Sequence, residues 1–242
     1  MRTRFKTLTV GLVLATAAMA GCSSTTGSSG AVQDEVPQGA SCADGGVCVV
    51  SDSGPGGGVV FYVASTAFAC GANMASTCKY LESAPNLWNP DSKISCKAAT
   101  GTSCGGSVQE TSDFSSTGLG FPWCTGSGDT TDVNAKETGI GAGFANTTAM
   151  LSVCNPGDAG NVARSYTGGG LTDWSLASLR EMSELYFYNN RAAIGGFNSG
   201  WYWSSSQSFL EKSYAQSFKS TGDRPQEQYK KDSYGVRPIR AF

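Results

Sequence analysis

Nine cysteines carry most of the reactive chemistry in this sequence. An odd number is unexpected in an oxidised protein unless one cysteine has another fate, and Cys22 stands apart in a context described below. The other eight fall into near neighbours along the chain, which predicts the local disulfides Cys42–Cys48, Cys70–Cys78, Cys96–Cys104 and Cys124–Cys154. A zinc site is disfavoured, because the sequence has no Cys-x2-Cys pair and no histidine.

The absence of histidine also limits catalysis. A Ser-His-Asp triad, a Cys-His pair and a histidine general base are all impossible, which leaves carboxylate or lysine chemistry. The sequence shows no recognisable catalytic set, so we predict no cofactor and no enzymatic activity. One acidic string could hold Ca²⁺, although it lacks the spacing of a calcium-binding loop and a solvated loop is favoured. Its members are Asp129, Asp132, Asn134 and Glu137.

An aromatic run, GWYWSSSQ at residues 200–207, is the second chemical feature. In a strand, Trp201 and Trp203 share one face while Tyr202 and Ser204 share the other. Only the tryptophan face has enough apolar area to seat in a core, which predicts buried Trp201 and Trp203. The alternative interpretation makes Trp203 part of a sugar-binding platform. The predicted ligand-facing residues are Tyr202 and Ser204, joined by Arg237 and Arg240 of the final strand, and the predicted core aromatics also include Trp174.

The elements that must position these residues alternate between strands and helices. An apolar run at 59–63 follows a glycine-rich turn, and 79–84 is expected to pair with it across a hairpin stapled by Cys70 and Cys78. Glycines that precede a strand do not form a phosphate-binding loop. Residues 86–138 are predicted to be mostly loop. Helices are expected at 140–151, 157–166 and 178–189, the last with Ser178 and Glu181 as a capping box, and strands at 201–206, 214–220 and 234–242.

The beginning of the sequence predicts export. Three basic residues precede an uncharged apolar run at 8–20 that is too short for a comfortable membrane span. The run ends in Met-Ala-Gly-Cys, which resembles the lipobox of bacterial lipoproteins, so we predict a signal peptide at 1–21 and lipidation of Cys22. An ordinary secretory signal is the alternative. Residues 22–49 then form an anchored flexible tether with a small stapled segment, and 50–242 form the domain.

The charge of the mature chain argues against nucleic acid as a partner. Removing residues 1–21 leaves 14 basic against 19 acidic residues, a net charge of −5. Such a surface has no general attraction for polyanions. The expected partner is the membrane, reached through the lipid anchor, which would be the outer membrane in a diderm bacterium. The sequence makes no prediction about the oligomeric state.

Five ordered segments share a pattern of glycines, aromatics and helix-capping residues: GGGVVFYV (56–63), GAGFANT (141–147), GGGLTDWSLASLREMSELY (168–186), YWSSS (202–206) and VRPIRAF (236–242). Together they resemble the bacterial DUF1566 family, to which the C-terminal domain of the Legionella collagen-like adhesin belongs. Two positions depart from the family pattern W-x-L-P-S-x-x-E-L, because Ala177 replaces the proline and Met182 the last leucine.

The resemblance implies an α+β, C-type-lectin-like fold with short antiparallel strands, two to three helices and long disulfide-stapled loops. It also implies an adhesin-like role in binding glycan or extracellular matrix and surface components, and it carries over no catalytic residues. Two other hypotheses stay open. One is an enzyme related to formylglycine-generating folds, and the other is a structural envelope protein without a soluble ligand.

Overall fold

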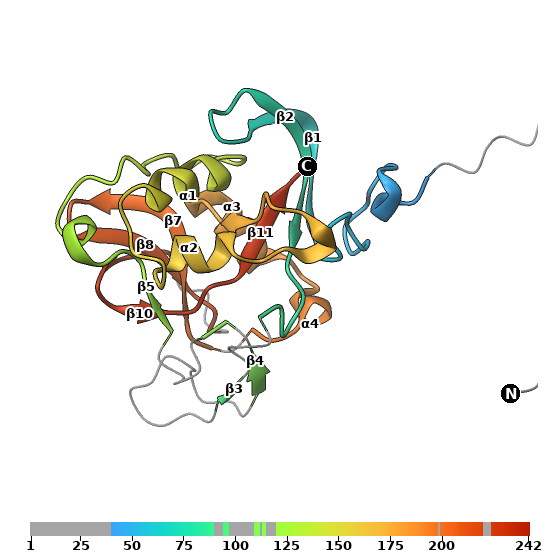
Figure 1. The fold of residues 1–242 in the computed structure, drawn as a ribbon. Helices are drawn as coiled ribbons and strands as arrows, with labels where there is room; N and C mark the ends of the chain where they lie inside the picture. Colours follow the sequence, from blue (N-terminus) through green and yellow to red (C-terminus); the bar gives the residue numbers. More distant parts are fainter. Residues whose placement is uncertain are drawn as a thin grey trace, which may run out of the picture. The chain divides into compact units, whose positions relative to one another are not determined.

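The computed structural model describes residues 40–89, 94–96, 109–111, 113–114, 120–197, 199–219 and 224–242. The chain divides into two units, Met1–Gln38 and Gly39–Phe242, and all described residues belong to the second. The predicted signal peptide and Cys22 therefore lie outside the described residues. The second unit is a mixed α+β domain built on antiparallel sheets, as predicted (Figure 1).

The main sheet has four strands in the order β1-β2-β11-β6. Every neighbouring pair in it is antiparallel, and the strands are β1 Val59–Cys70, β2 Ser76–Ser83, β11 Pro238–Ala241 and β6 Ser175–Leu176. The first strand is rich in valine and aromatic residues, which suit a pleated and half-buried surface. It is longer than the predicted 59–63 and forms the expected hairpin with β2, closed by the Cys70–Cys78 disulfide.

A second sheet has three antiparallel strands in the order β7-β8-β9. Two further two-stranded pairs lie outside these sheets. The three-stranded sheet consists of β7 Trp201–Phe209, β8 Lys212–Ser217 and β9 Gln226–Tyr229. The two pairs are β5 Phe121–Pro122 with β10 Ser233–Tyr234, and β3 Ile94–Cys96 with β4 Gln109–Thr111.

The helices contact both large sheets. Helix α1 contacts β6, β7 and β11, α2 contacts β6 and β11, and α3 contacts β1, β7 and β8. Their bounds are α1 Gly143–Leu151, α2 Ala159–Arg164, α3 Leu179–Phe187 and α4 Arg191–Ile194, with 3-10 turns at Cys42–Asp44, Gly126–Asp129 and Gly168–Gly170. Within the described part of the chain, none of the helices has the length and apolar character needed to cross a membrane.

The capping box predicted at the start of α3 is confirmed. The Ser178 Oγ atom accepts a hydrogen bond from the Glu181 backbone N–H, and the Ser178 backbone N–H donates to Glu181 Oε2 at 2.6 Å. These two bonds satisfy donors that a helix start otherwise leaves unpaired. Ser178 is therefore the N-cap residue of α3.

Aromatic residues fill the core. Trp174 and Trp203 are fully buried, as predicted, together with Trp123. Trp201 is only partly buried and packs against the same cluster, so it does not occupy the fully buried position that strand alternation predicted. Strand β7 runs beneath α1 and α3, which is why its middle residues lose their solvent contact.

Three of the four predicted disulfides are present. Cys42–Cys48 staples a short segment, and Cys124–Cys154 links the irregular middle of the chain to the end of α1. The fourth pair, Cys96–Cys104, falls outside the described side chains. Disulfides form and persist in oxidising compartments, so the protein is not cytoplasmic. Cys42 and Cys48 cluster with buried Val60, so the stapled segment, which we assigned to the tether, packs on the domain.

Candidate binding site

The residues predicted to face a ligand are mostly buried, and this prediction is wrong for three of the four. Tyr202 is fully buried and its hydroxyl lies 3.0 Å from Asp113 Oδ2. Ser204 is also buried and donates to the Tyr214 carbonyl at 2.8 Å. The reason is that β7 is covered on both sides, so its alternating side chains do not divide into a buried and an exposed face.

Arg237 is the third misassigned residue, because it is fully buried in an ion pair. Its Nε and Nη2 atoms donate to the two Asp113 carboxylate oxygens, each at 2.7 Å. Trp88 Nε1 and the Tyr202 hydroxyl bind the same carboxylate. This bidentate ion pair and its further partners hold the start of strand β11 in the core. Because Arg237 is fully buried, its side chain is not accessible to a ligand.

Arg240 retains slight exposure but is committed to two carboxylates. Its Nε atom lies 2.5 Å from Asp173 Oδ1, and its Nη1 atom lies 3.0 Å from Glu82 Oε1. Burial raises the pKa of Glu82, and the hydrogen bond from Arg240 opposes that rise. The backbone N–H of Gly56 also donates to this carboxylate at 3.0 Å, so the glycine-rich turn wraps around Glu82.

The acidic string considered for Ca²⁺ does not converge. Asp132 pairs with the Lys136 ammonium and accepts the Asn134 backbone N–H, both local contacts on an exposed turn. In the described part of the chain, the single group with metal-ligand spacing is Cys124, Cys154 and Asp158. Both of its sulfurs are bonded to each other, so it offers no thiolate.

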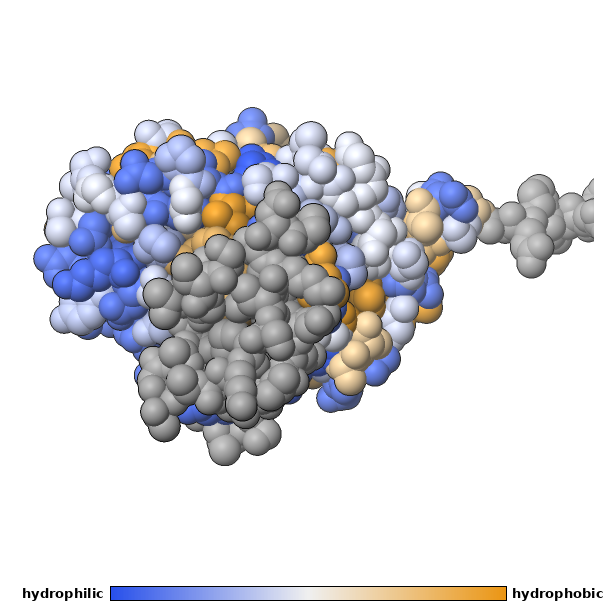
Figure 2. Space-filling model, turned by 60° about the horizontal axis from the view of Figure 1, so that its bottom comes forward, coloured by the Kyte–Doolittle hydropathy of each residue, from blue (hydrophilic) through white to orange (hydrophobic). Residues whose placement is uncertain are grey.

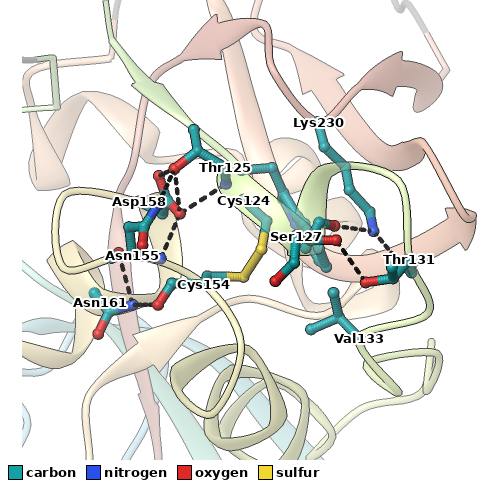
Figure 3. Close-up of a disulfide and its surroundings, with 12 residues drawn as sticks. Cys124, Thr125, Ser127, Thr131, Val133, Cys154, Asn155, Asp158, Asn161 and Lys230 are labelled. Carbon is teal, nitrogen blue, oxygen red and sulfur yellow. Dashed lines mark hydrogen bonds between the residues drawn. A yellow bond between two sulfur atoms is a disulfide. The ribbon is translucent and has the colours of Figure 1, made fainter.

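The hydrogen bonds of Asp158 explain why its carboxylate lies close to the Cys124–Cys154 disulfide (Figure 3). Asp158 accepts hydrogen bonds from the backbone N–H of Thr125 and of Asn155 at 2.8 and 2.7 Å, which fixes the two cysteine-bearing segments side by side. On the other side, buried Lys230 donates to the carbonyls of Gly128 and Thr131 at 2.8 and 2.7 Å.

The Lys230 ammonium has a structural role, because it binds these two carbonyls inside the domain. Burial lowers the pKa of its ammonium to about 8, against the opposing charges of Asp129 and Asp132. Its Nζ atom also lies 5.0 Å from the Trp123 ring centroid, a distance at which a cation is attracted to the ring. These contacts tie the loop after β5 to the loop after β9.

The surface offers a better candidate beside α4. A hollow of about 350 Å³ lies at the C-terminal end of this short helix, and its size falls within the range of small-ligand pockets. On the coloured part of the face shown in Figure 2, apolar residues form patches among polar ones. The hollow is lined by Arg191, Ala192, Gly195, Gly196, Phe197 and Phe218.

Local backbone geometry shapes this hollow. Helix α4 is four residues long and is followed by Gly195, whose φ of 73° is in the range that favours glycine. The next residue, Gly196, has a φ of 74°, and a Cβ atom there would lie 2.1 Å from the Asn86 Oδ1 atom. Two glycines are therefore needed for the chain to turn from α4 and bring Phe197 back against Phe218.

The aromatic side of the hollow is tightly packed. The Phe197 and Phe218 rings stack with centroids 4.7 Å apart and planes 7° apart. The Arg191 guanidinium lies 4.7 Å from the Tyr186 ring and 5.4 Å from the Phe218 ring. Its Nη1 atom donates to the Tyr186 carbonyl at 2.5 Å. The rings and this bond hold the guanidinium at the edge of the hollow.

This hollow was not predicted from the sequence. The signals available in residues 188–197, YNNRAAIGGF, are two asparagines that end one helix and two glycines that end the next, with one arginine between them. They predict a turn, but the partner Phe218 comes from the end of another strand. No protein-family model matches the chain, and no curated protein shows significant similarity to it.

Proposed function

We propose that this protein is a lipid-anchored module of the bacterial cell envelope that binds a glycan or an extracellular matrix or surface component. In this proposal the domain has a C-type-lectin-like fold of the DUF1566 type. The motifs at 56–63, 168–186 and 236–242 support the family, and the disulfides support an oxidising location. The Met-Ala-Gly-Cys sequence that ends at Cys22 supports the anchor.

The observation that carries the binding role is the hollow beside α4. It combines a cationic side chain, an aromatic wall and turn glycines at a surface position, which is the kind of concave site that holds a small part of a larger ligand. The buried ion pairs elsewhere in the domain are structural, because their polar groups satisfy one another within the core.

The binding role is tested by screening the purified full-length protein against arrays of glycans and matrix proteins. A binder whose signal falls at least tenfold in the Arg191→Gln variant supports the proposal. Arg180→Gln is the matched control, because Arg180 is an exposed arginine on the neighbouring helix α3 and does not line the hollow. An array without any binder would overturn the ligand-binding role.

The anchor is tested separately with Cys22→Ser. We expect this variant to leave the membrane fraction and appear in the soluble exported fraction, because the acylated cysteine supplies the stable membrane attachment. Persistence of the variant in salt-washed membranes would contradict the anchor while leaving the binding role intact.

A further inference from the structure

We propose that the hollow beside α4 binds the C-terminal carboxylate of a polypeptide, with the Arg191 guanidinium as the anion-binding group. This inference rests on the proposed function and specifies it, because it assigns the surface component to a protein chain end instead of a glycan. Three observations support it: the side chains that line the hollow, the contacts that cover the faces of the aromatic rings, and the N–H donors of Arg191 that have no partner within the described residues.

Among the described residues that line the hollow, Arg191 is the one whose side chain forms hydrogen bonds. Arg191 is charged, whereas the others are two glycines, an alanine and two phenylalanines. A sugar carries several hydroxyls that lose water on binding and need replacement partners, and an unpaired polar group costs free energy when it is buried. A ligand with one concentrated charge beside an apolar group fits this lining better than a polyol does.

The aromatic rings do not offer a stacking platform. One face of Phe197 lies on Phe218 at 4.7 Å, and the Arg237 guanidinium lies over the Phe197 ring at 4.1 Å. Phe218 is buried and also contacts Tyr186 edge-on at 5.5 Å. The Arg191 guanidinium lies over the Phe218 ring at 5.4 Å. These contacts leave neither ring with an open face on which a sugar could stack.

Arg191 has the capacity to receive that anion. A guanidinium has five N–H donors, and in the described part of the chain Arg191 uses its Nη1 atom to bind the Tyr186 carbonyl and forms no ion pair. Arg237, by contrast, is neutralised by Asp113. A carboxylate accepts two parallel bonds from a guanidinium, and ring contacts already restrict the position of this one.

A peptide end supplies the remaining features. Its last side chain can lie against Ala192 and the half-buried Phe197, while its backbone lies near Gly195, which is partly exposed and has no side chain. The hollow of about 350 Å³ is at the small end of ligand pockets, which matches one or two terminal residues and not a long segment.

The test uses two tetrapeptides, acetyl-Gly-Gly-Ala-Leu with a free carboxylate and the same peptide with a C-terminal amide. Binding to the full-length protein is measured by NMR chemical-shift titration. We expect the acid to bind at least tenfold more tightly than the amide, because a charged hydrogen-bonding pair is lost in the amide. Arg191→Gln should abolish this difference, and Arg180→Gln should preserve it.

Equal binding of acid and amide, or no binding of either, would overturn the inference even if the Arg191 variant failed to fold, because the comparison is made on the unmodified protein. Methyl β-D-glucuronide serves as the sugar-borne carboxylate, and tighter binding of it than of the peptide acid would also overturn the inference. If a glycan from the screen binds the Arg191→Gln variant as tightly as the unmodified protein, the proposed function would hold but the hollow beside α4 would not be its binding site. Failure of both peptides and of the whole screen would remove both proposals.

Discussion

Asp113→Ala should be among the most damaging single changes in this domain. The Asp113 carboxylate is fully buried and accepts hydrogen bonds from Arg237 Nε and Nη2, from Trp88 Nε1 and from the Tyr202 hydroxyl at 2.7 to 3.0 Å. Its removal leaves a buried guanidinium without a counter-charge and two further donors without an acceptor.

The magnitude follows from these contacts. Breaking a buried ion pair by removing one partner costs about 3–5 kcal/mol. An unsatisfied buried donor adds about 1–3 kcal/mol, although relaxation around the site reduces that sum. We expect a loss of about 5 kcal/mol in the free energy of unfolding, which is a large part of the roughly 5–15 kcal/mol available to a native protein.

Urea unfolding with intact disulfides measures the effect. A slope of about 2–3 kcal/mol/M converts the loss into a midpoint lowered by about 2 M. Asp113→Asn keeps the shape of the side chain and one acceptor oxygen, so its urea midpoint should lie between those of the unmodified protein and Asp113→Ala. The control is Asp132→Ala, which removes an exposed ion pair with Lys136 and should leave the midpoint unchanged. If Asp113→Ala moved the midpoint no further than this control, the buried pair would not hold the core together.

Three further predictions concern the core. Trp203→Ala should cost about 3–5 kcal/mol and lower Tm by about 10 °C in calorimetry, because the ring is fully buried; a normal Tm would contradict its core role. Replacing Cys124 and Cys154 together by alanine should cost about 3–4 kcal/mol in urea unfolding, since this disulfide closes a long loop; an unchanged midpoint would refute that. Burial raises the pKa of Glu181 to about 7, so the folded state keeps a proton that the unfolded chain loses above its usual pKa of 4.5. This contribution to stability therefore declines as pH rises from about 5 to 7, and Glu181→Gln should abolish the decline. If the urea midpoint changed equally between pH 5 and pH 8 in the unmodified protein and in the variant, this role of Glu181 would be refuted.

Features that depend on nearby residues could be predicted from the sequence. The three observed disulfides join cysteines 6, 8 and 30 positions apart, and the capping box joins Ser178 to Glu181. Hairpin β1–β2 was also predictable, because an apolar strand, a short loop and its partner follow directly in sequence. Local spacing and propensity settle each of these features before tertiary packing begins.

Features that depend on distant residues could not be predicted in this way. Tyr202 lies on the strand face that alternation assigned to solvent, yet its hydroxyl meets Asp113, 89 positions away. Arg237 reaches the same carboxylate across 124 positions. The hollow beside α4 likewise needs Phe218 to pack on Phe197, and a period-two pattern cannot say what lies above either face of a strand.

The position of β11 affects the order in which the domain can fold. This strand, formed by residues 238–241, lies between β2 and β6 and not at an edge of the main sheet. Its Arg240 pairs with Glu82, 158 positions earlier. A chain that emerges N-terminus first cannot complete this sheet until residue 241 is free, and such long-range pairings form slowly. The short disulfide loops can therefore close before the sheet around β11 assembles.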